Sequence, residues 1–132
     1  MLPFAQYNQG WMEPQELARQ RQEFEARLKA IGDEDDPLSV YVQYVDWIVN
    51  NYGGQNKSSG LASLLGQATS AFKHDSLYKT DLRYLRLWTL YARQLERPQA
   101  LLIFASLLKR GIGTSYSLLY EEYANVLEVD GK

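Results

Sequence analysis

The chain has 132 residues and a formal net charge of -2, and 45% of its residues are hydrophobic and 13% aromatic. This composition supports one compact domain with a real core, and it excludes the class of disordered chains that combine few hydrophobic residues with high charge. Nucleic acid is disfavoured as a partner because binding to phosphates needs clustered Lys and Arg. No apolar run in the sequence approaches the roughly 20 residues that a membrane span needs. The absence of cysteine excludes disulfides and thiolate metal sites.

Residues 1–13 show no hydrophobic periodicity and contain Pro3 and Gly10, which predicts an N-terminal arm. Such an arm is either disordered or strapped across the surface of the domain. Its three aromatic residues favour the strapped arrangement: Phe4, Tyr7 and Trp11. The folded domain is expected over residues 14–132.

Two helices are predicted next. From Pro14 the sequence is strongly helical, and an apolar stripe that Arg21 interrupts runs to Gly32, where we expect the helix to end. The second helix is expected to begin at about Pro37, because the four acidic residues at 33–36 place negative charge at its positive N-terminus. The β-branched residues of 38–51 would also fit a strand, but the length of the segment favours a helix.

A third and a fourth helix follow after short polar links. Ser58 or Ser59 is expected to cap a helix that reaches residue 72. Thr80 or Asp81 is expected to begin the next helix, which reaches about residue 95.

The last two helices are separated by a glycine-rich turn. Pro98 opens the fifth helix, in which residues 101–108 are apolar on nearly every side, and this pattern predicts deep burial. The turn at residues 111–113 ends it. Thr114 or Ser115 is expected to cap a sixth helix that ends near residue 130.

An internal repeat refines this all-α interpretation. Leu-Trp-Thr-Leu-Tyr-Ala at 87–92 is echoed by Leu-Tyr-Glu-Glu-Tyr-Ala at 119–124, 32 residues later (119 minus 87), which is close to the tetratricopeptide period. The predicted fold class is therefore all-α, with about six helices in tetratricopeptide-like helical hairpins that form a right-handed α-solenoid. The sixth helix has no hairpin partner in this sequence, so we expect the natural protein to continue beyond residue 132.

No catalytic set is apparent. His74 lies beside Asp75 in a polar segment, where a solvated loop residue is the more common outcome. The Gly111-Ile112-Gly113-Thr114 motif lacks the lysine and the third glycine of a phosphate loop, which favours a tight interhelical turn. The acidic run at 33–36 lacks the spacing of a calcium loop and is interpreted as helix capping. We therefore expect no enzymatic activity, no cofactor and no metal.

Several stretches together resemble one family. They are Asp35-Asp36-Pro37-Leu38, Tyr44-Val45-Asp46-Trp47, residues 78–88, and Lys109-Arg110-Gly111-Ile112-Gly113-Thr114 followed by residues 118–124. Over about residues 20–129 the chain resembles the N-terminal homology region of the Bub and Mad mitotic-checkpoint proteins. The resemblance implies a divergent tetratricopeptide domain of the spindle assembly checkpoint, found in the nucleus, at kinetochores and in the cytoplasm.

The resemblance also implies a binding site. In vertebrate members, the domain binds a short helical motif of the kinetochore scaffold blinkin between two neighbouring helices. The positions of this chain that match the site are Trp88, Tyr91, Ser106 and Leu107. Trp88 and Leu107 keep the residue types of the family, whereas Tyr91 replaces a leucine and Ser106 replaces a tyrosine.

The leading hypothesis is a non-catalytic docking module that recruits a spindle checkpoint protein to kinetochores through short motifs of a scaffold protein. Other checkpoint proteins are further expected partners, and nucleic acid and membranes are not. Any kinase or pseudokinase domain of the full-length protein would lie far downstream. The alternative is a structural, self-associating helical repeat domain with no peptide ligand, and the expected state is a monomer or a weak dimer. The sequence does not decide whether the chain belongs to the Bub kinase branch or to the Mad branch of the family.

Overall fold

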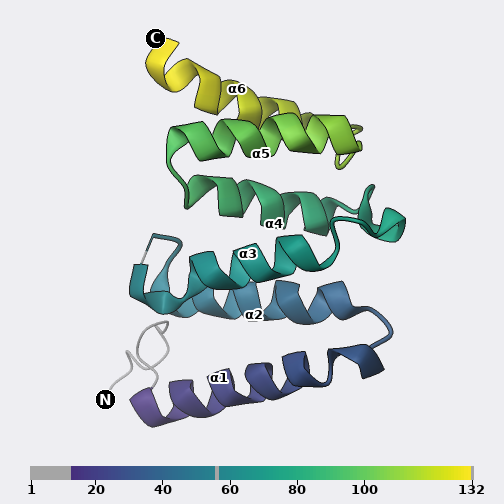
Figure 1. The fold of residues 1–132 in the computed structure, drawn as a ribbon. Helices are drawn as coiled ribbons and strands as arrows, with labels where there is room; N and C mark the ends of the chain where they lie inside the picture. The colour runs from purple at the N-terminus through teal and green to yellow at the C-terminus, as the bar shows by residue number, and fades with distance from the viewer. Residues whose placement is uncertain (1–12, 56, 132) are drawn as a thin grey trace. The chain divides into compact units, whose positions relative to one another are not determined.

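The computed structural model describes residues 13–55 and 57–131, and every regular element in this part of the chain is helical (Figure 1). The α-helices are α1 (Pro14–Lys29), α2 (Pro37–Tyr52), α3 (Leu61–Ala71), α4 (Leu82–Arg93), α5 (Arg97–Arg110) and α6 (Ser117–Gly131). Three 3-10 turns separate them, η2 (Ile31–Asp33), η3 (Lys57–Ser59) and η4 (Ser76–Tyr78). The all-α fold class and the six predicted helices are confirmed.

The chain forms two compact units, one up to Leu61 and one from Ala62. The predicted arm over residues 1–13 lies, apart from Glu13, outside the described residues. The division into an arm and a domain over 14–132 stays a prediction.

The first unit is built on the pairing of α1 with α2. Helix α2 supplies the core, and its buried residues recur at helical spacing: Leu38, Val40, Tyr41, Tyr44, Val45 and Ile48. Helix α1 has no buried residue, and its half-buried side follows the predicted stripe of Leu17, Arg21, Phe24 and Leu28. The Phe24 ring stacks on the Tyr44 ring with centroids 4.8 Å apart, which joins the two helices.

The ends of these helices partly match the sequence prediction. Helix α1 ends at Lys29, three residues before Gly32, and the chain continues as the 3-10 turn η2. Helix α2 begins at Pro37 as predicted, with Asp36, the last residue of the acidic run, at its N-cap position, although the Asp36 side chain makes no capping hydrogen bond. Ser59 was expected at a helix start, and its Oγ accepts the backbone N–H of Leu61 at 3.2 Å.

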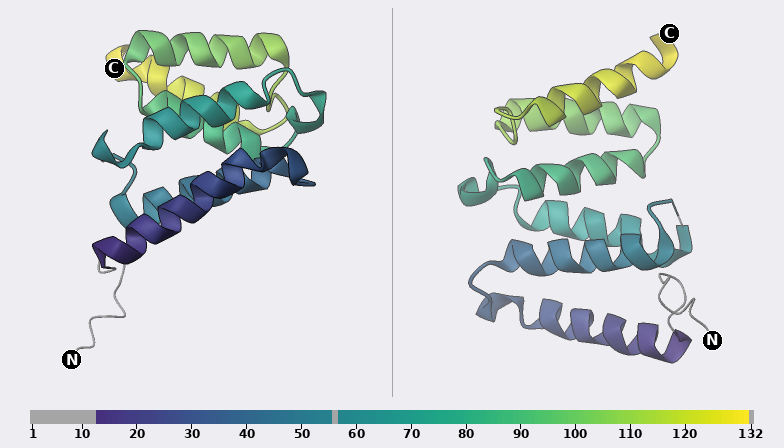
Figure 2. Two further views of the ribbon diagram at one scale, coloured as in Figure 1. Left: turned by 60° about the horizontal axis from the view of Figure 1, so that its bottom comes forward. Right: turned by 180° about the vertical axis from the view of Figure 1, so that it is seen from behind.

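The second unit contains the remainder of α3 and helices α4 to α6, in which α5 packs against both α4 and α6 (Figures 1 and 2). Its core is continuous and apolar, with the largest fully buried side chains at Tyr84, Phe104, Leu65, Leu85, Leu107, Ile112 and Leu119. Asp81 is the N-cap residue of α4 as predicted, and its carboxylate accepts the N–H of Arg83 at 2.9 Å.

The glycine-rich segment is the predicted interhelical turn. Gly111 ends α5 in the left-handed conformation (φ 74°), and the N–H of Ile112 then donates to the carbonyl of Leu107 at 2.9 Å. Gly113 also has a positive φ, of 70°, and its N–H donates to the carbonyl of Lys79 at 2.8 Å. The turn is thereby fixed to the segment that precedes α4.

Helix α6 begins at Ser117, so Tyr116 precedes its first turn, and the predicted cap at Thr114 or Ser115 is wrong by two residues or one. The reason lies in the anchored turn. The N–H of Tyr116 donates to the carbonyl of Gly113 at 3.0 Å, and the Tyr116 hydroxyl donates to the carbonyl of Thr80 at 2.6 Å. These bonds hold the chain in a turn for one further step before the helix can start.

Helix α5 departs from the prediction of deep burial on every side. Only Ala100, Phe104 and Leu107 are buried in it, whereas Leu102 is 70% exposed and Leu108 is 38% exposed. The physical reason is that α5 packs against α4 and α6 through one side, and the other side faces solvent despite its apolar residues.

The internal repeat is reflected in part of the packing. Leu87 and Leu119, which open the two copies, are both buried. The alanines that close them differ, because Ala92 of α4 is 4% exposed whereas Ala124 of α6 is exposed. The small residue therefore allows close helix contact in the first copy only.

Candidate functional site

The two predicted site residues on α4 form an aromatic pair. Trp88 and Tyr91 are both half-buried, and their ring centroids lie 6.3 Å apart. The buried Trp88 indole N–H has no hydrogen-bond partner within residues 13–55 and 57–131. Because this N–H is buried, it lies out of reach of a binding partner, and it faces the Tyr84 side chain, whose pKa burial raises and the Trp88 side chain lowers.

Tyr91 lies over a glycine of α3. A Cβ added at Gly66 would come 3.2 Å from the Tyr91 hydroxyl oxygen, so the absence of a side chain at Gly66 makes room for the tyrosine. This contact positions the Tyr91 ring on the surface between α3 and α4.

Beneath this pair, α3 is fixed to α4 by a buried hydrogen bond. The Tyr84 hydroxyl donates to the carbonyl of Thr69 at 2.6 Å. Burial raises the pKa of Tyr84 to about 12, against a smaller lowering by the Trp88 side chain. The phenol is therefore neutral at physiological pH and keeps the proton that it donates.

The two predicted site residues on α5 differ in exposure. Ser106 is half-buried and lines a hollow of about 510 Å³ together with Ala105, Lys109 and Arg110. Leu107 is 0% exposed, so it belongs to the core that holds α5 against its neighbours. The structure thus places three of the four residues at or near the surface, on the adjacent helices α4 and α5, and buries the fourth.

The electrostatics of the hollow are set by its rim. Lys109 and Arg110 are exposed in the last turn of α5, and the Arg110 Nε donates to the Ser106 Oγ at 3.3 Å. The small side chains of Ala105 and Ser106 leave the space, and the two cations give it a positive edge. Such a hollow suits an apolar side chain that is followed by an acidic group.

A cation–aromatic cluster in the first unit is absent from the sequence prediction. The guanidinium carbon of Arg21 lies 5.1 Å from the Trp47 ring centroid, 5.6 Å from that of Tyr52 and 6.0 Å from that of Tyr44. The same guanidinium donates to the Tyr44 hydroxyl at 3.2 Å and to the carbonyl of Ser59 at 3.1 Å. The signal available in the sequence was an arginine at an apolar position of a helical stripe.

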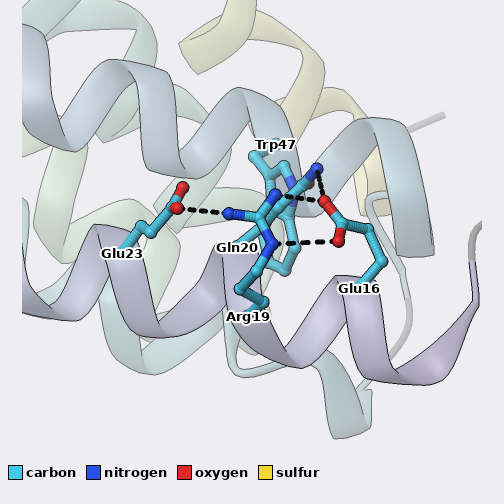
Figure 3. Close-up of polar contacts among 5 residues, drawn as sticks. All are labelled: Glu16, Arg19, Gln20, Glu23 and Trp47. Carbon is cyan, nitrogen blue, oxygen red and sulfur yellow. Dashed lines mark hydrogen bonds and ion pairs between the residues drawn. The ribbon is translucent and has the colours of Figure 1, made fainter.

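Figure 3 shows the neighbouring polar contacts of α1. The Trp47 indole donates to the Gln20 side chain at 2.7 Å, and Gln20 donates in turn to Glu16 at 3.0 Å. Arg19 pairs with Glu16 and Glu23, and this pairing lowers the pKa of Glu16. All three charged residues are exposed, or nearly so, so they contribute little to stability.

The described residues offer no group of three His, Cys, Asp or Glu side chains that is able to hold a metal ion. His74 is exposed in the segment between α3 and η4, as expected for a solvated loop residue. None of the described helices is long and apolar enough to cross a membrane.

The helical hairpins of the second unit, together with the partly open surface of α4 and α5, define a tetratricopeptide-like helical domain. Residues 19–132 match the family model described as Mad3/BUB1 homology region 1, and the chain belongs to this family. The resemblance seen in the sequence is thereby confirmed.

Individual relatives agree with this assignment. The chain is 39% identical over 116 residues to the "Mitotic spindle checkpoint component mad3" of Schizosaccharomyces pombe. This match covers 87% of the chain and 37% of the fission yeast protein. Among solved structures it is similar to a chain of a mitotic checkpoint complex (TM-score 0.80, 35% identity, 92% of this chain and 57% of that chain). It is also similar to the conserved N-terminal domain of the mitotic checkpoint component BUB1 (TM-score 0.76, 29% identity, 86% and 60%).

These matches set the level of the functional assignment. The chain is the helical homology region 1 of a spindle checkpoint family and not a catalytic domain. It spans about a third of the length of the fission yeast relative.

Proposed function

We propose that this chain is a docking domain that brings a spindle checkpoint protein to kinetochores by binding a short helical motif of a scaffold protein. The observation that carries the proposal is the hollow of about 510 Å³ at Ser106, which lies on the helix that follows the aromatic pair of α4. A helical motif needs an apolar recess and a few polar anchors on a rigid helical surface. Helices α4 and α5 provide both.

Three groups have assigned roles in this proposal. The half-buried Trp88 and Tyr91 rings supply apolar contact area, and the hollow at Ser106 receives an apolar side chain of the motif. Leu107 acts from beneath, since it is buried and fixes the register of α5. Truncation of Leu107 would therefore weaken binding indirectly, by disturbing the packing of α5 against its neighbours.

The proposal extends to location and to other partners. A domain with this function works in the nucleus, at kinetochores and in the cytoplasm. The similar chain in a mitotic checkpoint complex supports a second set of partners among checkpoint proteins. These partners fit the same helical surface without any nucleic acid or membrane contact.

The test is a fluorescence anisotropy titration of the purified chain with a labelled peptide that carries the helical motif of the kinetochore scaffold from the same organism. We expect saturable binding, and we expect Tyr91→Ala and Ser106→Arg each to weaken it at least about 10-fold, because one removes apolar area and the other fills the hollow. Asn125→Arg is the control, since Asn125 is exposed on α6 and its variant adds the same charge.

Circular dichroism must show unchanged helicity in all three variants. Wild-type affinity in folded Tyr91→Ala and Ser106→Arg would refute the site. Absence of binding by the wild-type chain at about 1 mM peptide, the weak limit of specific recognition, would refute the function.

A further inference from the structure

The segment between α3 and α4 carries basic residues that the proposed docking function does not use. It includes the 3-10 turn η4, which lies at the same end of the second unit as the turn between α5 and α6 (Figure 1). The two segments are joined, because the N–H of Gly113 donates to the carbonyl of Lys79 at 2.8 Å. This end of the unit therefore holds three cations: Lys73 and Lys79 from the segment, and Arg110, the last residue of α5.

Arg110 lies on the side of α5 that is turned away from α6. Arg97, at the other end of α5, donates to a carbonyl of α6, and 13 residues (110 minus 97) at about 100° each place Arg110 about 140° around the helix from Arg97. Burial is the main cause of the raised pKa of Tyr84, and the charges of Arg110 and Asp75 also act on this pKa, in opposite directions. Arg110 and the segment that contains Asp75 therefore lie near the same ring.

Little negative charge balances these three cations. In residues 13–55 and 57–131 none of the three forms an ion pair, and the Arg110 side chain donates to the neutral Ser106 hydroxyl of its own helix at 3.3 Å. Two carboxylates lie in the segment between α3 and α4. Asp81 pairs with Arg83 at 2.7 Å, which leaves Asp75 as the carboxylate of this segment that faces three cations.

Leu77 stands among these charges on a rigid turn. Its N–H donates to the Asp75 carboxylate at 2.9 Å, and its side chain is 72% exposed. The turn is fixed to the unit, because Tyr78 is buried and the hydroxyl of Tyr116 donates to the carbonyl of Thr80 at 2.6 Å. A partner that covers this leucine therefore meets a surface that needs little further ordering.

We propose that this end of the second unit is a docking surface for an acidic peptide segment of another protein, in which an apolar residue lies among Asp and Glu side chains. Charge complementarity identifies the occupant, because its carboxylates meet the three cations while its apolar residue covers Leu77. A nucleic-acid strand would also want exposed aromatic rings for its bases, and Tyr78 is buried. The formal net charge of the chain is -2, so the attraction belongs to this surface and not to the whole chain.

This inference does not rest on scaffold binding. Lys73 and Lys79 lie outside the hollow that is proposed for the scaffold motif, whereas Arg110 lines that hollow as well. Changes at the two lysines therefore test the surface for the acidic peptide alone. Lys73→Glu combined with Lys79→Glu should leave the affinity for the scaffold peptide at the wild-type value, and a loss of both affinities would overturn the claim of a separate surface.

The test is a fluorescence anisotropy titration of the chain with a labelled peptide of about 12 residues, made of Asp and Glu with leucines at its centre, in about 50 mM salt. We expect saturable binding that weakens at least about 5-fold in about 300 mM salt, because salt screens exposed charges. The double lysine variant should bind at least about 10-fold more weakly than the wild type, and Leu77→Ser about 5-fold more weakly.

The matched control is Lys29→Glu combined with Lys57→Glu, which makes the same charge change at two exposed lysines of the first unit. Circular dichroism must show unchanged helicity, and Lys73→Gln with Lys79→Gln takes the place of the double lysine variant if charge reversal disturbs the fold. The proposal would be overturned by a wild type that does not bind in low salt, by an equal loss in the control, or by wild-type affinity in the lysine variant or in Leu77→Ser. Tighter binding of a single-stranded DNA of about 12 nucleotides would overturn it as well.

Discussion

Gly113→Ala tests the packing that fixes the turn between α5 and α6. The substitution adds two penalties. The backbone of Gly113 has a φ of 70°, where an L side chain costs about 1–2 kcal/mol. The new Cβ would also lie 2.8 and 2.9 Å from the two terminal methyl carbons of Leu85.

The contact with Leu85 cannot relax cheaply, because Leu85 is 0% exposed in the core. Overpacking of this kind costs about 1–3 kcal/mol. The expected total for Gly113→Ala is therefore about 2–5 kcal/mol, a large fraction of the stability of a small domain.

The assay is urea unfolding followed by circular dichroism, with Gly111→Ala as the matched control. Gly111 has nearly the same φ, 74°, but an added Cβ there meets no atom within 4 Å, so we expect only the backbone cost of about 1–2 kcal/mol. Leu85→Ala combined with Gly113→Ala should cost less than the sum of the single changes. Equal losses in Gly111→Ala and Gly113→Ala would refute the reasoning.

Two further predictions concern buried polar contacts. Tyr84→Phe removes the hydrogen bond to Thr69 and should destabilise the chain by about 1–2 kcal/mol at neutral pH. Because the pKa of Tyr84 in the folded chain is raised from 10.0 to about 12, the stability that Tyr84 contributes is present below pH 10 and is lost as the pH rises through 12. The urea midpoints of wild type and variant should therefore converge over that pH range. Arg21→Ala should cost about 1–3 kcal/mol in thermal unfolding through its ring contacts and two hydrogen bonds. Arg19→Ala, which removes exposed pairs, should stay within about 0.5 kcal/mol, and equal effects of the two arginine variants would contradict the assigned role of Arg21.

Much of the fold was predictable because local signals agreed with the final packing. Proline at the first turn, the Asp81 cap and the glycines after α5 all act within a few residues, and the structure uses each of them. The start of α6 was not predictable in this way. It depends on bonds from Gly113 to Lys79 and from Tyr116 to Thr80, which join segments more than 30 residues apart (113 minus 79, 116 minus 80).

Burial on α5 shows where periodicity stops being informative. Apolar residues on every side predicted burial on every side, but only the neighbours present decide which side is covered, and Leu102 is left in solvent. The same limit applies to the predicted site. The family resemblance selected Trp88, Tyr91, Ser106 and Leu107 as one set, and only the packing of the helices shows that Leu107 is buried while the other three are half-buried. The Arg21 cluster was missed because its rings come from α2, whose register against α1 no local pattern supplies.

The closest helix packing joins neighbours in sequence: α1 with α2, α4 with α5, and α5 with α6. Bringing such helices together closes only short loops, and chains dominated by local contacts fold within microseconds to milliseconds. Synthesis on the ribosome adds about 5–20 residues per second, which is far slower. Each hairpin therefore has time to form as it emerges, and the first unit is complete while the ribosome is still translating the codons for α6.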